Sequence, residues 1–268
     1  MVRIAIAGVA GRMGKAILTL ALRDKNLQVT GAFEKDGSPA VGTDLGVFGG
    51  GQSLGIKIGN SVDEAVKNAD ALIDFTHPTT TEAHLKAVLK NKTGYVVGTT
   101  GLDEKILSSL KEASKNISIV QSPNMSIGVN LLFKLSELTA KALDEDYDIE
   151  IAETHHRMKK DAPSGTALKL LEVVAKARGR DIKKDTVTGR DGETGARPRG
   201  QIGVLALRGG DVIGDHTVSF LAEGERVELV HKASSRDAFA QGALKAAKFV
   251  ASKQNGLYNM LQVLGIDF

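Results

Sequence analysis

The stretch Val2-Arg-Ile-Ala-Ile-Ala-Gly-Val-Ala-Gly-Arg-Met-Gly14 decides the fold, because it joins a largely apolar run to a turn rich in glycine. The apolar run predicts a buried strand, and apolar residues at helical spacing after Gly14 predict a helix. Glycines let the backbone approach a pyrophosphate, which then lies on the helix N-terminus. The stretch therefore predicts a dinucleotide-binding domain. Because Ala10 stands where the second glycine of G-x-G-x-x-G would be, a glycine-rich turn of another α/β protein is the alternative.

Two charged residues follow the second predicted strand, Leu27–Phe33. Glu34 lies about 20 residues after Gly14, where an acidic side chain accepts hydrogen bonds from the adenine ribose hydroxyls of NADH. Lys35, the next residue, could instead neutralise the 2′-phosphate of NADPH. The pair therefore predicts that the domain accepts both NADH and NADPH.

Small or polar residues also follow the next three predicted strands. The segments are Thr76-His77-Pro78, Gly98-Thr99-Thr100-Gly101 and Gln121-Ser122-Pro123-Asn124-Met125-Ser126. Five strand–helix repeats of this kind predict an α/β, Rossmann-like domain with a doubly wound parallel sheet, whose ligands bind at the carboxyl ends of the strands. His77 could contact the nicotinamide side or be only a polar loop residue. Residues 37–59 are rich in glycine and predict a mobile connection, with one short strand at most.

The chemically densest stretch, residues 150–167, has the pattern of a strand end, a cationic loop and a helix start. A lysine, with a reference pKa of about 10.4, stays charged at neutrality until it gives up a proton, so the lysines of this stretch are able to donate one. His155 can exchange protons near neutrality, because the reference pKa of histidine is about 6.5. Unpaired amides at the helix start, Ser164, Gly165 and Thr166, can bind a carboxylate or a phosphate.

The second half of the chain predicts an α+β domain with an open mixed sheet. A strand at residues 148–153 is joined by three short patterned runs, 202–207, 212–221 and 226–230, which predict antiparallel strands. Such a sheet commonly pairs with copies of itself. Residues 185–200, with four glycines and one proline, are either a flexible loop or a lid. The acidic run at residues 144–148 is either a cation site or a solvated segment.

Length and composition narrow the remaining possibilities. At a length of 268 residues, a single hydrophobic core usually gives way to two. We therefore expect two domains. Residues 1–126 with 237–268 would form a dinucleotide-binding domain, and residues 127–236 a substrate-binding and oligomerisation domain. A net charge of +3 from 35 basic and 32 acidic residues is too balanced for a nucleic-acid binder. There is no cysteine, and no apolar run approaches the roughly 20 residues of a membrane span. We therefore expect a cytoplasmic protein that uses no thiol chemistry.

The remaining cationic side chains indicate an anionic ligand held without a metal. The adjacent side chains of His155 and His156 diverge on an extended segment, and no third ligand is spaced to join them. Arg236, which precedes a predicted helix at 238–251, either grips a substrate carboxylate with two hydrogen bonds or is an ordinary surface arginine. We therefore expect a small anion as the partner and no metal.

Motifs from nearly end to end of the chain resemble the dihydrodipicolinate reductase family. They are Gly8-Val-Ala-Gly-Arg-Met-Gly14, Asp74-Phe-Thr76, Val97-Gly-Thr-Thr-Gly101, Glu153-Thr-His-His-Arg-Met-Lys159, Asp161-Ala-Pro-Ser-Gly-Thr-Ala167 and His231-Lys-Ala-Ser-Ser-Arg236. The resemblance implies NAD(P)H-dependent reduction of a cyclic imine dicarboxylate, 4-hydroxy-tetrahydrodipicolinate, to tetrahydrodipicolinate in the diaminopimelate pathway of lysine biosynthesis. It also implies a homotetramer built through the sheet of the second domain.

The resemblance further implies roles for individual residues. His155 would be the acid/base and Lys159 the proton donor. The residues expected to bind the substrate are His156, Ser164, Gly165 and Thr166, to which the pattern before the helix at 238–251 adds Arg236. The residues expected to bind the cofactor are Gly8, Val9, Ala10, Gly11, Arg12, Met13, Glu34, Lys35, Gly98, Thr99, Thr100, Ser122, Pro123, Asn124 and Met125. Within this set, Lys35 stands where some members of the family carry arginine, and Met125 stands where phenylalanine is expected.

Two other interpretations stay open on the sequence. One is another two-domain dehydrogenase that acts on an amino acid or a semialdehyde, although the absence of cysteine argues against the thioester kind. The other is a noncatalytic module that senses nucleotide by changing conformation. Consumption of NADPH with the imine substrate distinguishes all three, because a sensor binds the cofactor without turnover.

Overall fold

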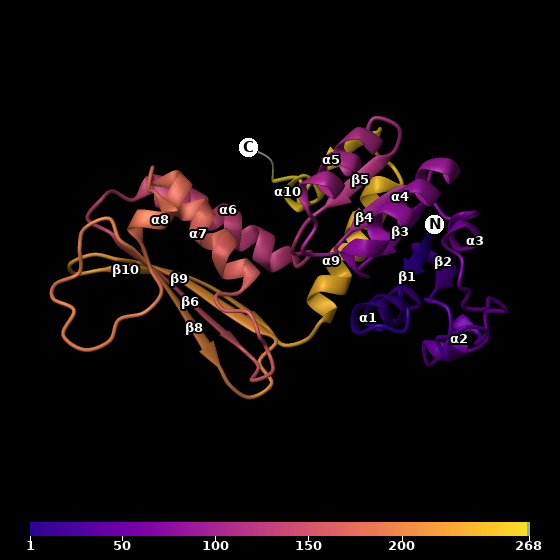
Figure 1. Ribbon diagram of the computed structural model, residues 1–268, viewed down its shortest axis with the longest axis horizontal. Helices are drawn as coiled ribbons and strands as arrows, with labels where there is room; N and C mark the ends of the chain where they lie inside the picture. Colours follow the sequence, from indigo (N-terminus) through magenta and orange to yellow (C-terminus); the bar gives the residue numbers. More distant parts are fainter. Residues whose placement is uncertain (267–268) are drawn as a thin grey trace. The chain divides into compact units, whose positions relative to one another are not determined.

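The computed structural model describes residues 1–266, which fold into two compact units (Figure 1). The first unit comprises Met1–Ile127 and the chain from Arg236 onward, and the second comprises Gly128–Ser235. Each unit contains a sheet and a core of its own. Within residues 1–266, no helix combines the length and the apolar character that a membrane crossing requires.

Six parallel strands form the sheet of the first unit, in the order β11-β5-β4-β3-β1-β2. The strands are β1 (Val2–Ala7), β2 (Leu27–Phe33), β3 (Ala71–Asp74), β4 (Gly94–Val97), β5 (Ser118–Gln121) and β11 (Gly256–Tyr258). This order confirms the predicted doubly wound parallel sheet. The sequence pattern does not predict β11, because three residues are too few to show a periodicity.

Helices cover both faces of this sheet. They are α1 (Arg12–Ala21), α2 (Leu45–Phe48), α3 (Val62–Val66), α4 (Pro78–Asn91), α5 (Glu104–Ala113), α9 (Asp237–Val250) and α10 (Met260–Leu264). Alternate residues of β1 face opposite sides: Ile4 and Ile6 share a core cluster with α1 and α9, whereas Ala5 and Ala7 share one with α4 and α5. Burial on both faces explains why the strands are continuously apolar.

Residues 37–59, expected to be a mobile connection, are organised around Asp44. Its carboxylate caps α2 by accepting hydrogen bonds from two amides of the first turn, and it also accepts from the amides of Leu54 and Gly55. Strand pairing in this segment is limited to isolated bridges. The Asp44 carboxylate and backbone hydrogen bonds, such as that from the amide of Gly42 to the carbonyl of Ile58, therefore hold the segment together without a regular strand.

Five strands form the sheet of the second unit, in the order β10-β9-β6-β8-β7. The strands are β6 (Asp148–His155), β7 (Thr186–Val187), β8 (Ile202–Arg208), β9 (Gly214–Leu221) and β10 (Arg226–Ala233). The predicted mixed sheet is confirmed, since β9 runs antiparallel to β6 and β10 while β8 runs parallel to β6 and β7. The expectation that all three later runs are antiparallel is wrong for β8. The long connection from β6 to β8 contains helices and so permits a parallel crossover.

Helices α6 (Ile127–Ala142) and α7 (Gly165–Ala177) lie on one side of this sheet, and the short α8 (Ile182–Asp185) follows α7 (Figure 1). Alternate residues of β6 point to that side, ending with Glu153 and His155. Leu138 of α6 is 43% exposed, whereas Ser136 and Ala140 face the core. The sheet and its two helices thus enclose polar groups at the end of β6.

The other side of the second sheet carries no helix of this unit in Figure 1. One row across it consists of residues that lie in register on four strands: Leu205 on β8, Ala152 on β6, Thr217 on β9 and Val230 on β10. Leu205 is 37% exposed and Val230 is 52% exposed. The sheet therefore presents a partly apolar open face.

Candidate active site

The predicted cofactor residues follow the carboxyl ends of four parallel strands. Residues 8–13 follow β1, Glu34 and Lys35 follow β2, residues 98–100 follow β4, and residues 122–125 follow β5. In a parallel sheet the carboxyl ends of the strands lie side by side, so the fold brings the four segments together along one edge, the carboxyl edge of the sheet. Open α/β sheets bind their ligands at this edge, beside the switch point of the strand order, which here lies between β1 and β3.

The turn after β1 depends on glycine at two positions. Gly8 has a φ of +62°, in the left-handed region that favours glycine. A Cβ on Gly14 would lie 2.2 Å from the carbonyl oxygen of Gly8, so only glycine lets α1 start this close to the strand end. Gly11, the N-cap of α1, makes no side-chain cap, which leaves first-turn amides for an anion such as a pyrophosphate.

Glu34 is joined to the same turn. Its Oε1 accepts a hydrogen bond of 2.7 Å from the amide of Ala10, and its Oε2 lies 3.3 Å from the amide of Lys35. The side chain of Glu34 is half-buried, whereas Lys35 is exposed. The carboxylate thus keeps acceptor capacity for ribose hydroxyls, and a cation lies next to it along the chain.

Two of the predicted cofactor residues offer only their backbone to a ligand. The side chains of Val9 and Met125 are 0% and 1% exposed and belong to the core. The loop containing Met125 is held by its own polar groups, since Ser122 donates to the carbonyl of Asn124 at 2.7 Å. The side chains of Thr99 and Ser122 are also buried, whereas those of Arg12 and Thr100 are exposed. The substitution of phenylalanine by Met125 therefore concerns core packing.

Asp74, the last residue of β3, is a buried acceptor that organises this edge. Its carboxylate accepts from the hydroxyl of Thr76 at 2.6 Å and from that of Tyr95 at 2.6 Å, and it lies 2.7 Å from Nδ1 of His84. Burial by itself would raise the pKa of Asp74, but the hydrogen bonds from His84 and the hydroxyls hold that pKa below its ordinary value. Asp74 thereby fixes the turn that follows β3.

His77, in that turn, has a local structural role. Its ring Nδ1 accepts a hydrogen bond of 3.3 Å from the amide of Thr79 and so caps α4, and the residue is exposed. The structure therefore gives a physical reason for interpreting His77 as a polar loop residue, which was one of the two possibilities left by the sequence.

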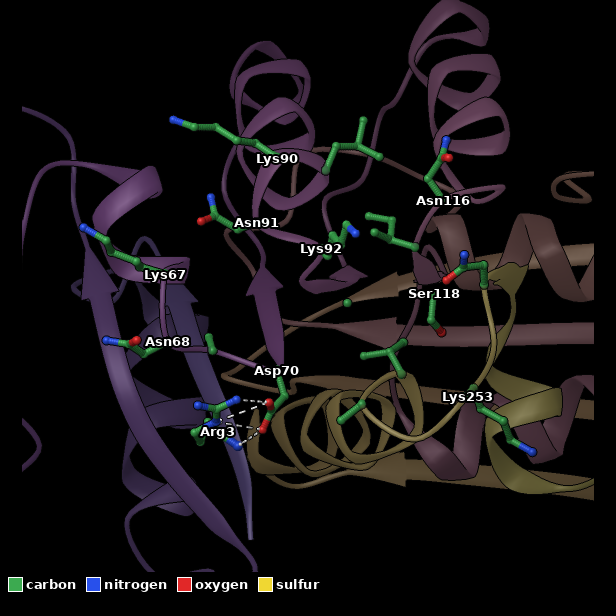
Figure 2. A pocket seen from close by; sticks show the side chains of 17 residues that line it. Arg3, Lys67, Asn68, Asp70, Lys90, Asn91, Lys92, Asn116, Ser118 and Lys253 are labelled. Carbon is green, nitrogen blue, oxygen red and sulfur yellow. Dashed lines mark hydrogen bonds and ion pairs between the residues drawn. The ribbon is translucent and has the colours of Figure 1, made fainter.

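An open cavity of about 1010 Å³ lies at the opposite, amino edge of the first sheet (Figure 2). Arg3 and Asp70 line it and bind one another through a contact of 2.6 Å. Lys67 and Lys92 are the C-cap residues of α3 and α4, where a cation interacts favourably with the helix dipole. Helix ends thus account for these lysines, and the predicted site residues lie elsewhere.

In the second unit the densest polar cluster surrounds Glu153 of β6, whose side chain is fully buried. Arg208, at the end of β8, donates two hydrogen bonds of 2.9 Å, one to each carboxylate oxygen. Nδ1 of His155 lies 2.5 Å from Oε2, and the amide of Ser164 donates to Oε1 at 3.0 Å. Burial alone would raise the pKa of Glu153, but these hydrogen bonds outweigh it and hold the pKa below its ordinary value.

His155, predicted to be the acid/base, is 8% exposed. Desolvation lowers its pKa, the hydrogen bond with Glu153 raises it, and the charges of Lys159 and Arg208 lower it again. The net pKa lies below the ordinary value for histidine, so His155 is mostly neutral at neutral pH. Its ring meets that of the buried His216 edge to face, with centroids 5.2 Å apart.

Ser164 is the N-cap of α7. Its Oγ accepts from the amide of Ala167 at 3.1 Å and lies 3.2 Å from Nε2 of His216 on β9. Burial and the neighbouring His155 lower the pKa of His216 to about 4, so this ring is neutral at neutral pH. Gly165 is exposed, with open space where a Cβ would stand. The start of α7, with Gly165 and Thr166, is therefore approachable by an anion.

Lys159, predicted to be the proton donor, lies in the loop after β6. Its Nζ is 2.9 Å from both carboxylate oxygens of Asp161, and its side chain is 20% exposed. His156 is half-buried and held through its amide, which donates to the carbonyl of Val212 at 2.7 Å. In the second unit, His155 thus ends β6, His156 and Lys159 follow in the next loop, and α7 starts a few residues further on.

Arg236 belongs to the other unit. It is half-buried and occupies the N-cap position of α9, where it makes no side-chain cap. The structure therefore groups Arg236 with the nucleotide-binding fold, and Ser164 with the second sheet.

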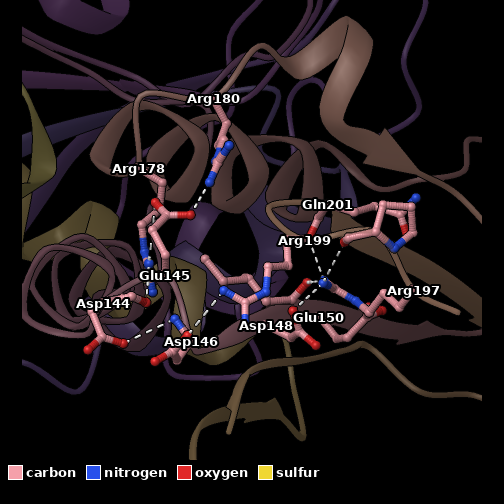
Figure 3. Close-up of polar contacts among 12 residues, drawn as sticks. Asp144, Glu145, Asp146, Asp148, Glu150, Arg178, Arg180, Arg197, Arg199 and Gln201 are labelled. Carbon is pink, nitrogen blue, oxygen red and sulfur yellow. Dashed lines mark hydrogen bonds and ion pairs between the residues drawn. The ribbon is translucent and has the colours of Figure 1, made fainter.

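The acidic run at residues 144–148 binds arginines (Figure 3). Glu145 pairs with Arg180, Asp148 with Arg197, and Asp146 with Arg199. Arg197 also donates to Glu150 of β6 at 3.1 Å, so the segment 185–200 is tied to the sheet. Within residues 1–266, no three His, Asp or Glu side chains are grouped so that they could hold a metal ion. Arginines thus pair with three of the acidic side chains of this run, Glu145, Asp146 and Asp148.

Sequence reasoning missed four polar residues of these clusters: Asp74, Glu153, Arg208 and His216. Two of them had a signal. Asp74 closes an apolar strand, and Glu153 falls on the same side of its strand as the apolar Ile149 and Ile151, so a buried and hydrogen-bonded carboxylate was predictable. Arg208 and His216 had none, because their contacts depend on the register between strands.

Two family models match nearly the whole chain. The model described as dihydrodipicolinate reductase, N-terminus, matches residues 2–125, and the C-terminus model matches residues 128–264. The chain is 50% identical over 263 residues to the 4-hydroxy-tetrahydrodipicolinate reductase of Cupriavidus pinatubonensis. It is 48% identical over 264 residues to that of Polynucleobacter necessarius. Each alignment covers 98% of this chain and 99% of the relative.

Solved structures share the fold. Dipicolinate-bound dihydrodipicolinate reductase from Paenisporosarcina sp. TG-14 matches with a TM-score of 0.79 over 98% of both chains, at 24% identity. An amine dehydrogenase from Mycobacterium smegmatis matches with a TM-score of 0.62 over 97% of this chain and 95% of its own, at 12% identity. At these identities the likeness concerns the fold alone.

Proposed function

The chain belongs to the dihydrodipicolinate reductase family, and from this premise we propose how its residues carry out the reaction of that family. The reaction is the NAD(P)H-dependent reduction of 4-hydroxy-tetrahydrodipicolinate to tetrahydrodipicolinate, in the diaminopimelate pathway of lysine biosynthesis. The chain is therefore an oxidoreductase. The buried Glu153–His155 pair beside the start of α7 is the observation that best supports the roles assigned to the site residues.

The first unit, in this proposal, holds the nucleotide. Residues 8–13 cradle the pyrophosphate at the start of α1, Glu34 accepts hydrogen bonds from the adenine ribose, and Lys35 faces the 2′-phosphate when it is present. Residues 98–100 and 122–125 complete the edge. When bound, NADH or NADPH supplies the hydride. A carboxylate followed by an exposed lysine supports the use of both nucleotides.

The second unit binds the substrate, which is a dicarboxylate. The start of α7, where Gly165 is exposed, receives one carboxylate through backbone amides of Gly165 and Thr166, and the buried Ser164 positions these amides as the N-cap. His156 or Arg236 receives the other. A dihydrodipicolinate reductase with this fold was solved with dipicolinate, a dicarboxylate, which supports the substrate class.

Lys159 and His155 handle the proton. The 4-hydroxyl group leaves as water, which gives the unsaturated imine. Hydride addition at a ring carbon of that imine produces negative charge that a proton must quench, and the ammonium of Lys159 supplies that proton. Asp161 holds the Nζ of Lys159 by two contacts of 2.9 Å. His155, neutral at neutral pH, accepts or returns a proton at its ring. Neither residue requires a metal.

We further propose that the chain forms a homotetramer through the open face of the second sheet. The exposed side chains of Leu205, Leu207 and Val230 on that face support this assembly. Light scattering on the purified protein gives the mass that tests it. The cytoplasmic location expected from the sequence stays a prediction.

The reaction is tested by mixing the protein with NADPH and enzymatically generated 4-hydroxy-tetrahydrodipicolinate. Loss of the absorbance of reduced nicotinamide, dependent on both substrates, is the expected result. An unrelated dehydrogenase would consume NADPH only with another substrate. A nucleotide sensor would bind NADPH, detected as a change in nicotinamide fluorescence, without any loss of absorbance.

A further inference from the structure

Building on the proposed function, we propose that Glu153 is a positioning residue that holds the acid/base histidine and the carboxylate-binding turn in one fixed relationship. Its Oε2 meets Nδ1 of His155 and its Oε1 meets the amide of Ser164. Arg208 holds the carboxylate itself, through one hydrogen bond to each oxygen. A single buried group thus connects the site of proton exchange to the site of substrate binding.

The hydrogen bonds at Glu153 favour its ionised form. Both contacts from Arg208 and the contact from the Ser164 amide come from donors that cannot accept, so each carboxylate oxygen already serves as an acceptor. A protonated carboxyl would lose the negative charge that pairs with the guanidinium of Arg208. The charged, bidentate geometry is also that in which an arginine–carboxylate pair is strongest.

An ionised Glu153 fixes the tautomer of His155. Because the carboxylate can only accept, Nδ1 of His155 carries a hydrogen in both protonation states of the ring. Proton exchange is then confined to Nε2. A Cβ on Gly214 of β9 would lie 3.0 Å from Nε2, so the glycine leaves that nitrogen room that an alanine would crowd.

The same carboxylate positions the start of α7. Ser164 is held through its amide by Glu153 and through its hydroxyl by His216, whose Nε2 lies 3.2 Å from Oγ. Ser164 in turn caps α7 at the amide of Ala167. The orientation of the amides that follow Ser164 is therefore set from two strands, β6 and β9.

Five charged or titratable groups determine how this arrangement responds to pH. His155 is faced by Glu153 on its own strand, by Arg208 from β8, by His216 from β9 and by Lys159 from the following loop. Glu153 alone among them raises the pKa of His155. Loss of the negative charge at Glu153 must therefore move the pKa of His155 to a lower value.

A buried ion pair can also be purely structural, and such pairs are common. The two roles differ in what a change at Glu153 affects. A structural role lowers the free energy of unfolding but leaves kcat/KM of the folded enzyme near the wild-type value. A positioning role moves the pKa of His155 and also weakens turnover of the imine, while the nucleotide, bound by the other unit, keeps its affinity.

The test is the pH profile of kcat/KM for the imine in wild type, Glu153→Gln and Glu150→Gln. Glu150 lies on the same strand and also binds arginines, Arg190 and Arg197, but it does not contact His155. We expect Glu153→Gln to lower kcat/KM about tenfold or more, to shift the limb due to His155 to lower pH and to leave the Kd for NADPH within about twofold. Glu150→Gln should leave the profile in place.

An unshifted limb in Glu153→Gln, with wild-type enzyme active, would overturn the proposal. Absence of turnover by the wild type would instead contradict the proposed function. If Glu153→Gln does not fold, the tautomer of His155 in the wild type decides, from the ¹⁵N chemical shifts of its ring, assigned by their loss in His155→Asn. A neutral ring protonated on Nδ1 is expected, and one protonated on Nε2 would overturn the proposal.

Discussion

Nδ1 of His155 lies 2.5 Å from Oε2 of Glu153, two residues earlier on the same strand. Residues two apart on a strand share a face, so the alternation that buries Ile149 and Ile151 also buries this pair. The pattern that builds the core of the second unit thereby places an ionised carboxylate and a neutral imidazole inside it.

Arg208→Met should destabilise the protein by about 3 kcal/mol or more at neutral pH, because it leaves a buried carboxylate unpaired. In the wild type, the depressed pKa of Glu153 gives stability that is present above the unfolded pKa and is lost as pH falls through the folded one. Without Arg208, burial raises that pKa. The difference in free energy of unfolding between the wild type and Arg208→Met should therefore shrink as pH falls below about 5. Urea unfolding at several pH values measures it.

Arg190→Met is the matched control, since Arg190 binds Glu150 at the partly exposed edge of the same strand. It should cost about 1 kcal/mol or less and show no such trend with pH. A deficit in Arg208→Met that grows toward acid pH would contradict the assigned ionisation of Glu153.

Gly14→Ala should abolish tight binding of NADPH, because a Cβ at this position would stand 2.2 Å from the carbonyl oxygen of Gly8 and push α1 from the strand end. A loss of about 1–3 kcal/mol in stability should accompany it. Gly51→Ala is the control, as its Cβ would meet only an ordinary contact at 3.6 Å. Titration by nicotinamide fluorescence measures both variants, and equal affinities would refute the role of the turn.

Tyr95→Phe should lower the free energy of unfolding by about 1.5–3 kcal/mol, because it removes a 2.6 Å hydrogen bond to the buried carboxylate of Asp74. Tyr258→Phe, which removes a hydrogen bond at an exposed site, should cost about 1 kcal/mol or less. Denaturant unfolding of the two variants gives the comparison. Equal losses would mean that Asp74 does not organise the edge of the sheet as described.

Lys35→Ala should raise the KM for NADPH about tenfold, the effect of losing roughly 1.4 kcal/mol from one charged contact, and leave the KM for NADH within about twofold. Lys25→Ala, at another exposed lysine of the first unit, should change neither. Initial rates with each nucleotide provide the measurement. Parallel changes for NADH and NADPH would remove Lys35 from the 2′-phosphate site.

Local patterns sufficed for the parts of this structure that local rules govern. The turn at Gly8 and Gly14 and the run of strands ending in polar residues predict the parallel sheet and the edge that carries the cofactor residues. Ser164 predicts the start of α7, because capping involves neighbours along the chain.

Contacts between distant segments were not predictable in the same way. Arg208 and His216 reach Glu153 only through the register of β8 and β9, and β8 is parallel because of a crossover whose path no local pattern specifies. Asp44 organises a glycine-rich segment through amides some ten residues further on. In each case a long-range hydrogen bond, absent from the pattern, decides the structure.

The most direct test of the central claim is kcat for Lys159→Ala with NADPH and 4-hydroxy-tetrahydrodipicolinate, with Lys160→Ala, at the exposed neighbouring lysine, as control. The account predicts a fall in kcat of about a hundredfold or more for Lys159→Ala, with the Kd for NADPH unchanged, because the proton donor is lost and the nucleotide unit is intact. Near-wild-type kcat in Lys159→Ala would contradict it.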